Sequence, residues 1–146
     1  MVKSVFYVEG KHVQDVGLRM VLTEKIIHAG FTKGGVFNLP DGRVEVVLES
    51  TDEEKITSFH KAVVENLIAW LESATADKER LKHLIGNPGI SVSKLEFNEK
   101  LLVLDVGLFS HSLEFDQLLK GVDAYWELAD ALRGLKQVIA AAKQKS

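Results

Sequence analysis

The segment Pro40-Asp41-Gly42 separates two short, apolar-rich stretches, residues 34–39 and 43–49. Proline presets the first angle of a turn and glycine accepts a left-handed one, so this pattern predicts a β-hairpin. Within the second stretch, apolar residues at positions 44, 46 and 48 alternate with mostly polar ones. That alternation is typical of a strand with one buried side and one solvent-facing side.

The order of the remaining segments predicts an α+β fold. Residues 2–9 are rich in β-branched and aromatic types and predict a strand, 19–29 have helical spacing, and a longer helix is expected from 51 to about 71. Further expectations are a helical piece at 77–85, strands at 90–97 and 101–106, and helices from 112 onward. The order β-α-β-β-α-(α)-β-(β) indicates a ferredoxin-like βαββαβ sandwich with extra C-terminal helices.

Composition indicates a globular chain and disfavours several kinds of partner. The 146 residues are 46% hydrophobic and 27% charged, and the formal net charge of −3 argues against nucleic-acid binding. There is no cysteine, and the histidines lack the helical spacing of metal ligands, so we expect no metal and no cofactor. No apolar run approaches the roughly 20 residues of a membrane span, and the start lacks a secretion signal, so we expect a cytoplasmic protein that does not enter membranes.

The loop between the first predicted strand and the first predicted helix is a candidate anion site. Free backbone N–H groups and the positive end of a helix meet at such a turn, and Arg19 in the first helical turn adds a planar cation. The alternative is that Arg19 only faces solvent, and the residues by themselves leave both interpretations open.

Two stretches together resemble the acylphosphatase family. Residues 10–19 resemble a motif Gly-x-Val-Gln-Gly-Val-x-(Phe/Met)-Arg, and residues 34–44 resemble Gly-(aromatic)-Val-x-Asn followed by Gly-x-Val. The resemblance extends over roughly residues 2–97, and it implies hydrolysis of the carboxyl–phosphate anhydride of a small acyl phosphate, with release of inorganic phosphate. In that family the motif arginine and the loop amides hold the phosphoryl group, and the asparagine orients the attacking water. The resemblance therefore implies Arg19 and Asn38 as catalytic residues. The implied phosphate-binding loop consists of Val13, Gln14, Asp15, Val16 and Gly17.

The chain departs from the family pattern around this loop. Asp15 replaces a glycine; a carboxylate about 5 Å from a phosphate would cost about 3 kcal/mol at an effective dielectric near 20, but little if it pointed outward. Lys11 and His12 stand where the family has one residue, Lys33 is an apparent insertion, and Gly35 replaces an aromatic. Two functional hypotheses follow. One is a working hydrolase, and the other is a degenerate, inactive module that binds an anionic ligand or a protein partner.

The chain is longer than the family domain. We expect an acylphosphatase-like domain at 1–106, containing an inserted helix at about 74–86, and a helical extension at 107–146. The apolar stripe of the extension predicts either packing within the same chain or a homodimer seam. The sequence leaves these two alternatives open.

Overall fold

The computed structural model describes residues 1–86 and 89–109. The chain divides into two units, Met1–Ser110 and His111–Ser146, of which the second lies outside the described residues. The predicted tail helices and their stripe therefore also lie outside them. The helix expected at 77–85 is present at Lys78–Ile85. Its status as an insertion, the domain boundary at 106 and the dimer seam stay predictions.

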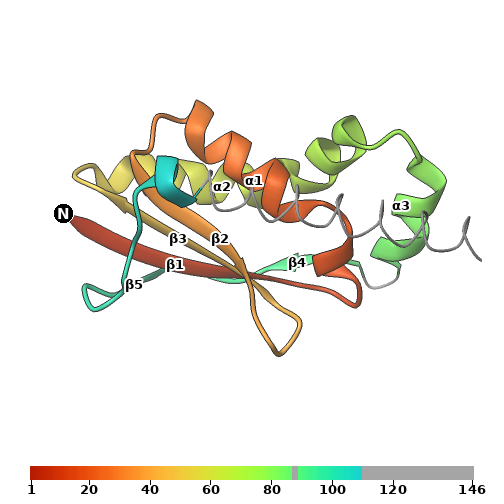
Figure 1. Ribbon diagram of the computed structural model, residues 1–146, viewed down its shortest axis with the longest axis horizontal. Coiled ribbons are helices and arrows are strands. Elements are labelled where there is room, and N and C mark those ends of the chain that lie inside the picture. Colours follow the sequence, from red (N-terminus) through yellow and green to blue (C-terminus); the bar gives the residue numbers. More distant parts are fainter. Residues whose placement is uncertain (87–88, 110–146) are drawn as a thin grey trace, which may run out of the picture. The chain divides into compact units, whose positions relative to one another are not determined.

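The first unit consists of an antiparallel sheet with helices packed on one side (Figure 1). The elements are β1 (Val2–Glu9), the 3₁₀ helix η1 (Val13–Asp15), α1 (Leu18–His28), β2 (Lys33–Asn38), β3 (Val44–Ser50), α2 (Glu53–Ala74), α3 (Lys78–Ile85), β4 (Ser91–Val92) and β5 (Glu96–Phe97). Four strands follow the order β2-β3-β1-β4, and β5 pairs with β1.

The strand pairing confirms the predicted fold class. Both β1 and β2 are antiparallel to β3, so they run in the same direction and α1 forms the crossover between them. Because β1 and β2 are parallel, their C-terminal ends lie at the same edge of the sheet. In the register, Val44 is opposite both Val8 of β1 and Asn38 of β2. This α+β arrangement with strand order β2-β3-β1-β4 is the ferredoxin-like one.

The main core lies between the sheet and the helices. Phe6, Val46 and Val36 are in register across three strands, and each is 0% exposed. The ring of Phe6 meets His60 of α2 edge-on, with the centroids 4.9 Å apart. Burying such side chains contributes about 1.5–3 kcal/mol each relative to exposure, so this layer fixes which side of the sheet faces the helices.

Helix α2 confirms the helix expected from 51 to about 71 and buries a stripe along one side. Asp52 caps the helix by accepting hydrogen bonds from the backbone N–H groups of Glu54 (3.0 Å) and Lys55 (3.4 Å). The last buried residue is Leu71, and Trp70 beside it is half-buried beneath the ammonium group of Lys25. The buried stripe consists of Ile56, Phe59, Val63, Leu67 and Leu71.

Residues 101–109 cover the other side of the sheet. A small apolar cluster is formed there by Val5, Val47 and Val103 together with Tyr7, Phe37 and Leu101. The ring of Phe109 also packs against Phe37, with the centroids 5.1 Å apart. The two sides of this sheet are therefore covered by different parts of the chain.

The two C-terminal strand predictions were wrong in extent. Residues 90–97 form two separate two-residue strands, because Ser93 between them accepts a hydrogen bond from the backbone N–H of Tyr7 with its Oγ and contacts His60 with its carbonyl. Residues 101–106 form one isolated bridge, between Lys33 and Asp105. The chain then turns helical over residues 106–109, where the carboxylate of Asp105 accepts from the backbone N–H of Leu108.

Gly35 occupies a crowded position on the side that residues 101–109 cover. A Cβ atom there would lie 2.9 Å from the ring of Phe37 and 3.4 Å from that of Phe109. We expect Gly35→Phe to lower the free energy of unfolding by about 1–3 kcal/mol through overpacking, as measured by urea denaturation. The same substitution should cost less in a Phe37→Ala background, which removes the ring that lies 2.9 Å from the new Cβ atom. An equal cost in both backgrounds would contradict this explanation.

Candidate phosphate-binding site

The loop after β1 makes a short 3₁₀ turn before α1 begins. Val13 anchors the turn with 1% of its surface exposed, and its backbone N–H donates to the carbonyl of Gly10 at 3.4 Å. The amide of Asp15 donates to the carbonyl of His12 at 2.9 Å, so these two loop amides have partners within the loop. Gly17 then takes a left-handed angle, φ 77°, and is the N-cap of α1. The loop therefore leads directly into the N-terminus of a helix, where backbone N–H groups favour an anion.

The side chain of Gln14 ties this loop to the neck of the β2–β3 hairpin. Its Nε2 donates to the carbonyl oxygens of Leu39 at 2.8 Å and Arg43 at 3.0 Å. The hairpin holds its own neck through Leu39 N–H to Arg43 O (2.9 Å) and Gly42 N–H to Leu39 O (3.1 Å). The sequence assigned Gln14 to the loop only through its backbone amide. The position of a glutamine in a loop does not show which carbonyl oxygens its side chain will reach.

Asn38 and Arg19 lie at the same edge of the sheet as the loop. Asn38 is the last residue of β2, is exposed, and is on the same side of its strand as Val36, which faces the helices. It directly precedes Leu39, the partner of Gln14. Arg19 is partly buried in the first turn of α1, immediately after the loop. The structure thus brings the loop and Asn38 to one edge and starts the Arg19-bearing helix there.

The carboxylate of Asp15 faces His12 within the loop. The side chain of Asp15 is 63% exposed, and its Oδ2 lies 3.4 Å from Nδ1 of His12. His12 and Lys11 together stand where the family motif has a single residue. No described non-glycine residue has a positive φ, so Asp15 occupies the glycine position without left-handed strain. The extra residue therefore supplies a polar partner for the substituted one.

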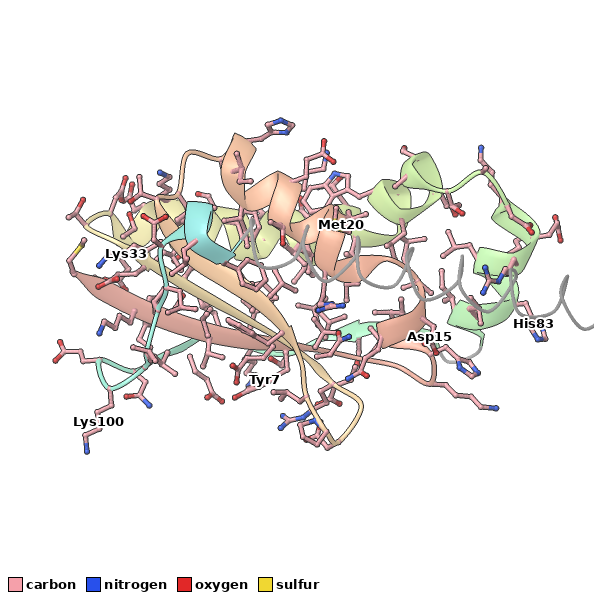
Figure 2. All side chains as sticks on the ribbon, in the orientation of Figure 1. Tyr7, Asp15, Met20, Lys33, His83 and Lys100 are labelled. Carbon is pink, nitrogen blue, oxygen red and sulfur yellow. The ribbon has the colours of Figure 1, made fainter. Side chains whose placement is uncertain are left out.

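The other two departures do not lie at this edge. Lys33 is at the start of β2, and Figure 2 shows it at the opposite end of the sheet from Asp15. Its ammonium group lies 3.6 Å from a carboxylate oxygen of Glu49, whose side chain is only 7% exposed. Gly35 faces away from the helices, toward Phe109. Both changes lie away from Asn38, because Lys33 is at the other end of β2 and Gly35 is on the opposite side of the strand.

A charged cluster holds the tip of the hairpin. The backbone N–H of Arg43 donates to the carboxylate of Asp41, which lowers the pKa of that carboxyl, and the guanidinium adds to the effect. The guanidinium of Arg43 lies 4.2 Å from the ring centre of Tyr7. Burial, followed by the charge of Glu45, raises the pKa of the Tyr7 hydroxyl. These contacts lie on the side of the sheet opposite Asn38 and stabilise the turn that presents it.

Within residues 1–86 and 89–109, no group of three or more His, Cys, Asp or Glu side chains is placed to hold a metal ion. The same described part of the chain contains no helix that is both long and apolar enough to cross a membrane.

The fold and this edge define an α+β domain whose first strand-to-helix loop leads into the N-terminus of α1. The acylphosphatase family model matches residues 4–86, more than half of the chain, and the chain therefore belongs to the acylphosphatase family. An acylphosphatase from Borrelia garinii subsp. bavariensis is 43% identical over 61 residues, which are 42% of this chain. The chain spans 63% of the length of that relative. A crystal structure of acylphosphatase from Bacillus subtilis is similar with 23% sequence identity and a TM-score of 0.40, over 70% of this chain and 89% of that one.

Proposed function

We propose that this chain hydrolyses acyl phosphates, with Arg19 and the loop of residues 13–17 holding the phosphoryl group and Asn38 orienting the attacking water. The water oxygen forms a bond to phosphorus, and the bond from phosphorus to the carboxylate oxygen breaks. The products are a carboxylate and inorganic phosphate, and a substrate oxygen receives the proton of the water. An acyl phosphate has a good leaving group, so positioning and electrostatic stabilisation suffice without a protein nucleophile.

The contact between Gln14 and the hairpin neck carries this proposal. One of its hydrogen bonds, 2.8 Å, joins the loop to Leu39, the residue that follows Asn38, and the other, 3.0 Å, joins it to Arg43 across the hairpin neck. A loop and a strand end that were free to move apart would not hold a phosphoryl group and a water in line. Membership of the acylphosphatase family supports the same reaction class.

The test is hydrolysis of benzoyl phosphate by the full chain and by Asn38→Ala. We expect turnover in the unaltered protein and a loss of about 10²-fold in kcat for Asn38→Ala, the size typical of removing one positioned polar group. Asn66→Ala is the matched control, because Asn66 is an exposed amide on α2 that donates only to the carbonyl of Ala62 in its own helix. An equal loss in both variants, or no loss in either, would refute the role of Asn38.

The exposed carboxylate of Asp15 is the observation in favour of a second function, that of an inactive module that binds an anion or a protein. Substituting Asp15→Gly separates the two hypotheses. If the negative charge of Asp15 slows a hydrolase, turnover rises in Asp15→Gly. If His12 holds that carboxylate away from the substrate, turnover in Asp15→Gly equals that of the unaltered protein. A module without catalysis shows no benzoyl phosphate hydrolysis before or after the substitution.

A further inference from the structure

A cavity lies beside the loop, on the side of α3. It has a volume of about 340 Å³ and is lined on one wall by Asp15, Val16 and Gly17 of the loop and by Met20 of α1. The opposite wall comes from the end of α2 and from α3. Figure 2 shows Asp15 at the loop next to α3, and the volume falls at the lower end of the roughly 300–1,000 Å³ of small-molecule sites.

The far wall of the cavity is mainly apolar. Leu71 and Leu81 are 1% and 4% exposed and form a fixed base, and Ala74 and Leu84 add apolar side chains beside the polar Thr75, Asp77 and Arg80. Val16 adds an apolar side chain from the loop itself. Such a surface favours hydrocarbon over water, because burying apolar area is favourable and the wall offers few hydrogen-bonding partners.

The charges at the rim select against a second anionic group on the ligand. Asp15 and Asp77 contribute two carboxylates and Arg80 contributes one guanidinium. The carboxylate of Asp77 accepts a hydrogen bond from the backbone N–H of Arg80 at 3.0 Å, as the N-cap of α3, so it is fixed in place. A ligand with a negative charge in its acyl part would meet these carboxylates in a space with an apolar base.

We propose that this cavity receives the acyl group of the substrate, and that the group is uncharged and apolar. The proposal rests on the proposed function, because residues 15–17 belong both to the cavity wall and to the loop assigned to the phosphoryl group. One bound molecule therefore reaches both, with its phosphoryl group at the N-terminus of α1 and its hydrocarbon part against Leu71, Leu81 and Leu84. The end of α2 and α3 are then the elements that determine substrate preference.

The experiment measures affinity with phosphonates that cannot be hydrolysed, so that it does not depend on turnover. Calorimetry gives the dissociation constants of methylphosphonate and hexylphosphonate for the full chain. Each methylene that leaves water contributes about fourfold in affinity. Because the cavity is open on one side, we expect hexylphosphonate to bind at least about tenfold more tightly than methylphosphonate.

Ala74→Phe fills the cavity from the end of α2, and Ala69→Phe is its matched control. Both alanines are exposed on the same helix, but only Ala74 lines the cavity. We expect Ala74→Phe to remove the preference for the longer phosphonate and Ala69→Phe to keep it, with both variants folded by circular dichroism. Equal affinity for the two phosphonates, no binding of either, or a preference that survives Ala74→Phe overturns the proposal. Benzoyl phosphate hydrolysis is assayed separately, so its absence would refute the proposed function while the phosphonate ratio still decides the cavity.

Discussion

Arg19→Ala should abolish most turnover of benzoyl phosphate while the domain stays folded. The guanidinium is the cation that we place on the phosphoryl group, where negative charge accumulates in the transition state. Removing one such group typically lowers kcat by 10²–10³-fold, and we expect a loss of about 10³-fold because a full charge is lost as well. Only part of the Arg19 side chain is buried, so the melting temperature should change little compared with the activity.

The shape of the guanidinium is tested by a second substitution. Arg19→Lys keeps the positive charge but removes the planar fork that binds two oxygens at once, so its activity should lie between those of the unaltered protein and Arg19→Ala. Lys25→Ala removes a cation from the same helix at a position over Trp70, away from the loop, and is the control. Steady-state kinetics on the four proteins suffices. Activity in Arg19→Ala equal to that in Lys25→Ala would remove Arg19 from the mechanism.

Short-range signals account for the parts of the fold that the sequence predicted correctly. The turn at residues 40–42 and the helix expected from 51 to about 71 each depend on neighbours within a few positions. Together they fix the element order, and the rule that adjacent elements pack with short connections leaves few ways to arrange it. The sheet of the ferredoxin-like fold follows from that order.

Long-range contacts account for what the sequence did not predict. The apolar run in residues 101–106 is the same whether the segment pairs along a strand or only touches one, and here a single bridge to Lys33 forms. The packing of Phe109 against Phe37, whose ring occupies the space beside Gly35, joins positions 72 residues apart. A sequence pattern carries no information about contacts of this kind.

The candidate site also contains features that the sequence predicted and features that it did not. The motif spacing placed Arg19 and Asn38 on elements that do meet at one edge, because β1 and β2 run in parallel. It did not show that Lys33, a position close to Asn38 in sequence, lies at the other end of β2. It also gave the side chain of Gln14 no role, although this side chain connects the two halves of the site.

Substitutions of Gln14 should therefore reduce activity more than stability. The carbonyls of Leu39 and Arg43 keep backbone donors of their own, from Gly42 and Leu39, when the Gln14 amide is removed. The hairpin neck remains satisfied, so we expect Gln14→Ala to cost only about 1 kcal/mol in the free energy of unfolding. The loop, however, loses its connection to the strand that ends at Asn38. A misplacement of about 1 Å can lower a rate by about 10²-fold, and we expect a loss of that size in kcat.

Gln14→Glu sharpens this prediction, because it keeps the length of the side chain and inverts its polarity. A carboxylate would face two carbonyl oxygens at the positions where the amide now donates at 2.8 and 3.0 Å. Repulsion would push the loop away from the hairpin, so kcat should fall below that of Gln14→Ala, and the free energy of unfolding should fall by a further 1–3 kcal/mol or so. Urea denaturation and benzoyl phosphate kinetics on both variants give the two quantities. If Gln14→Glu were as active as the unaltered protein, the loop and Asn38 would not need to be held together, and the site would have to be built without that connection.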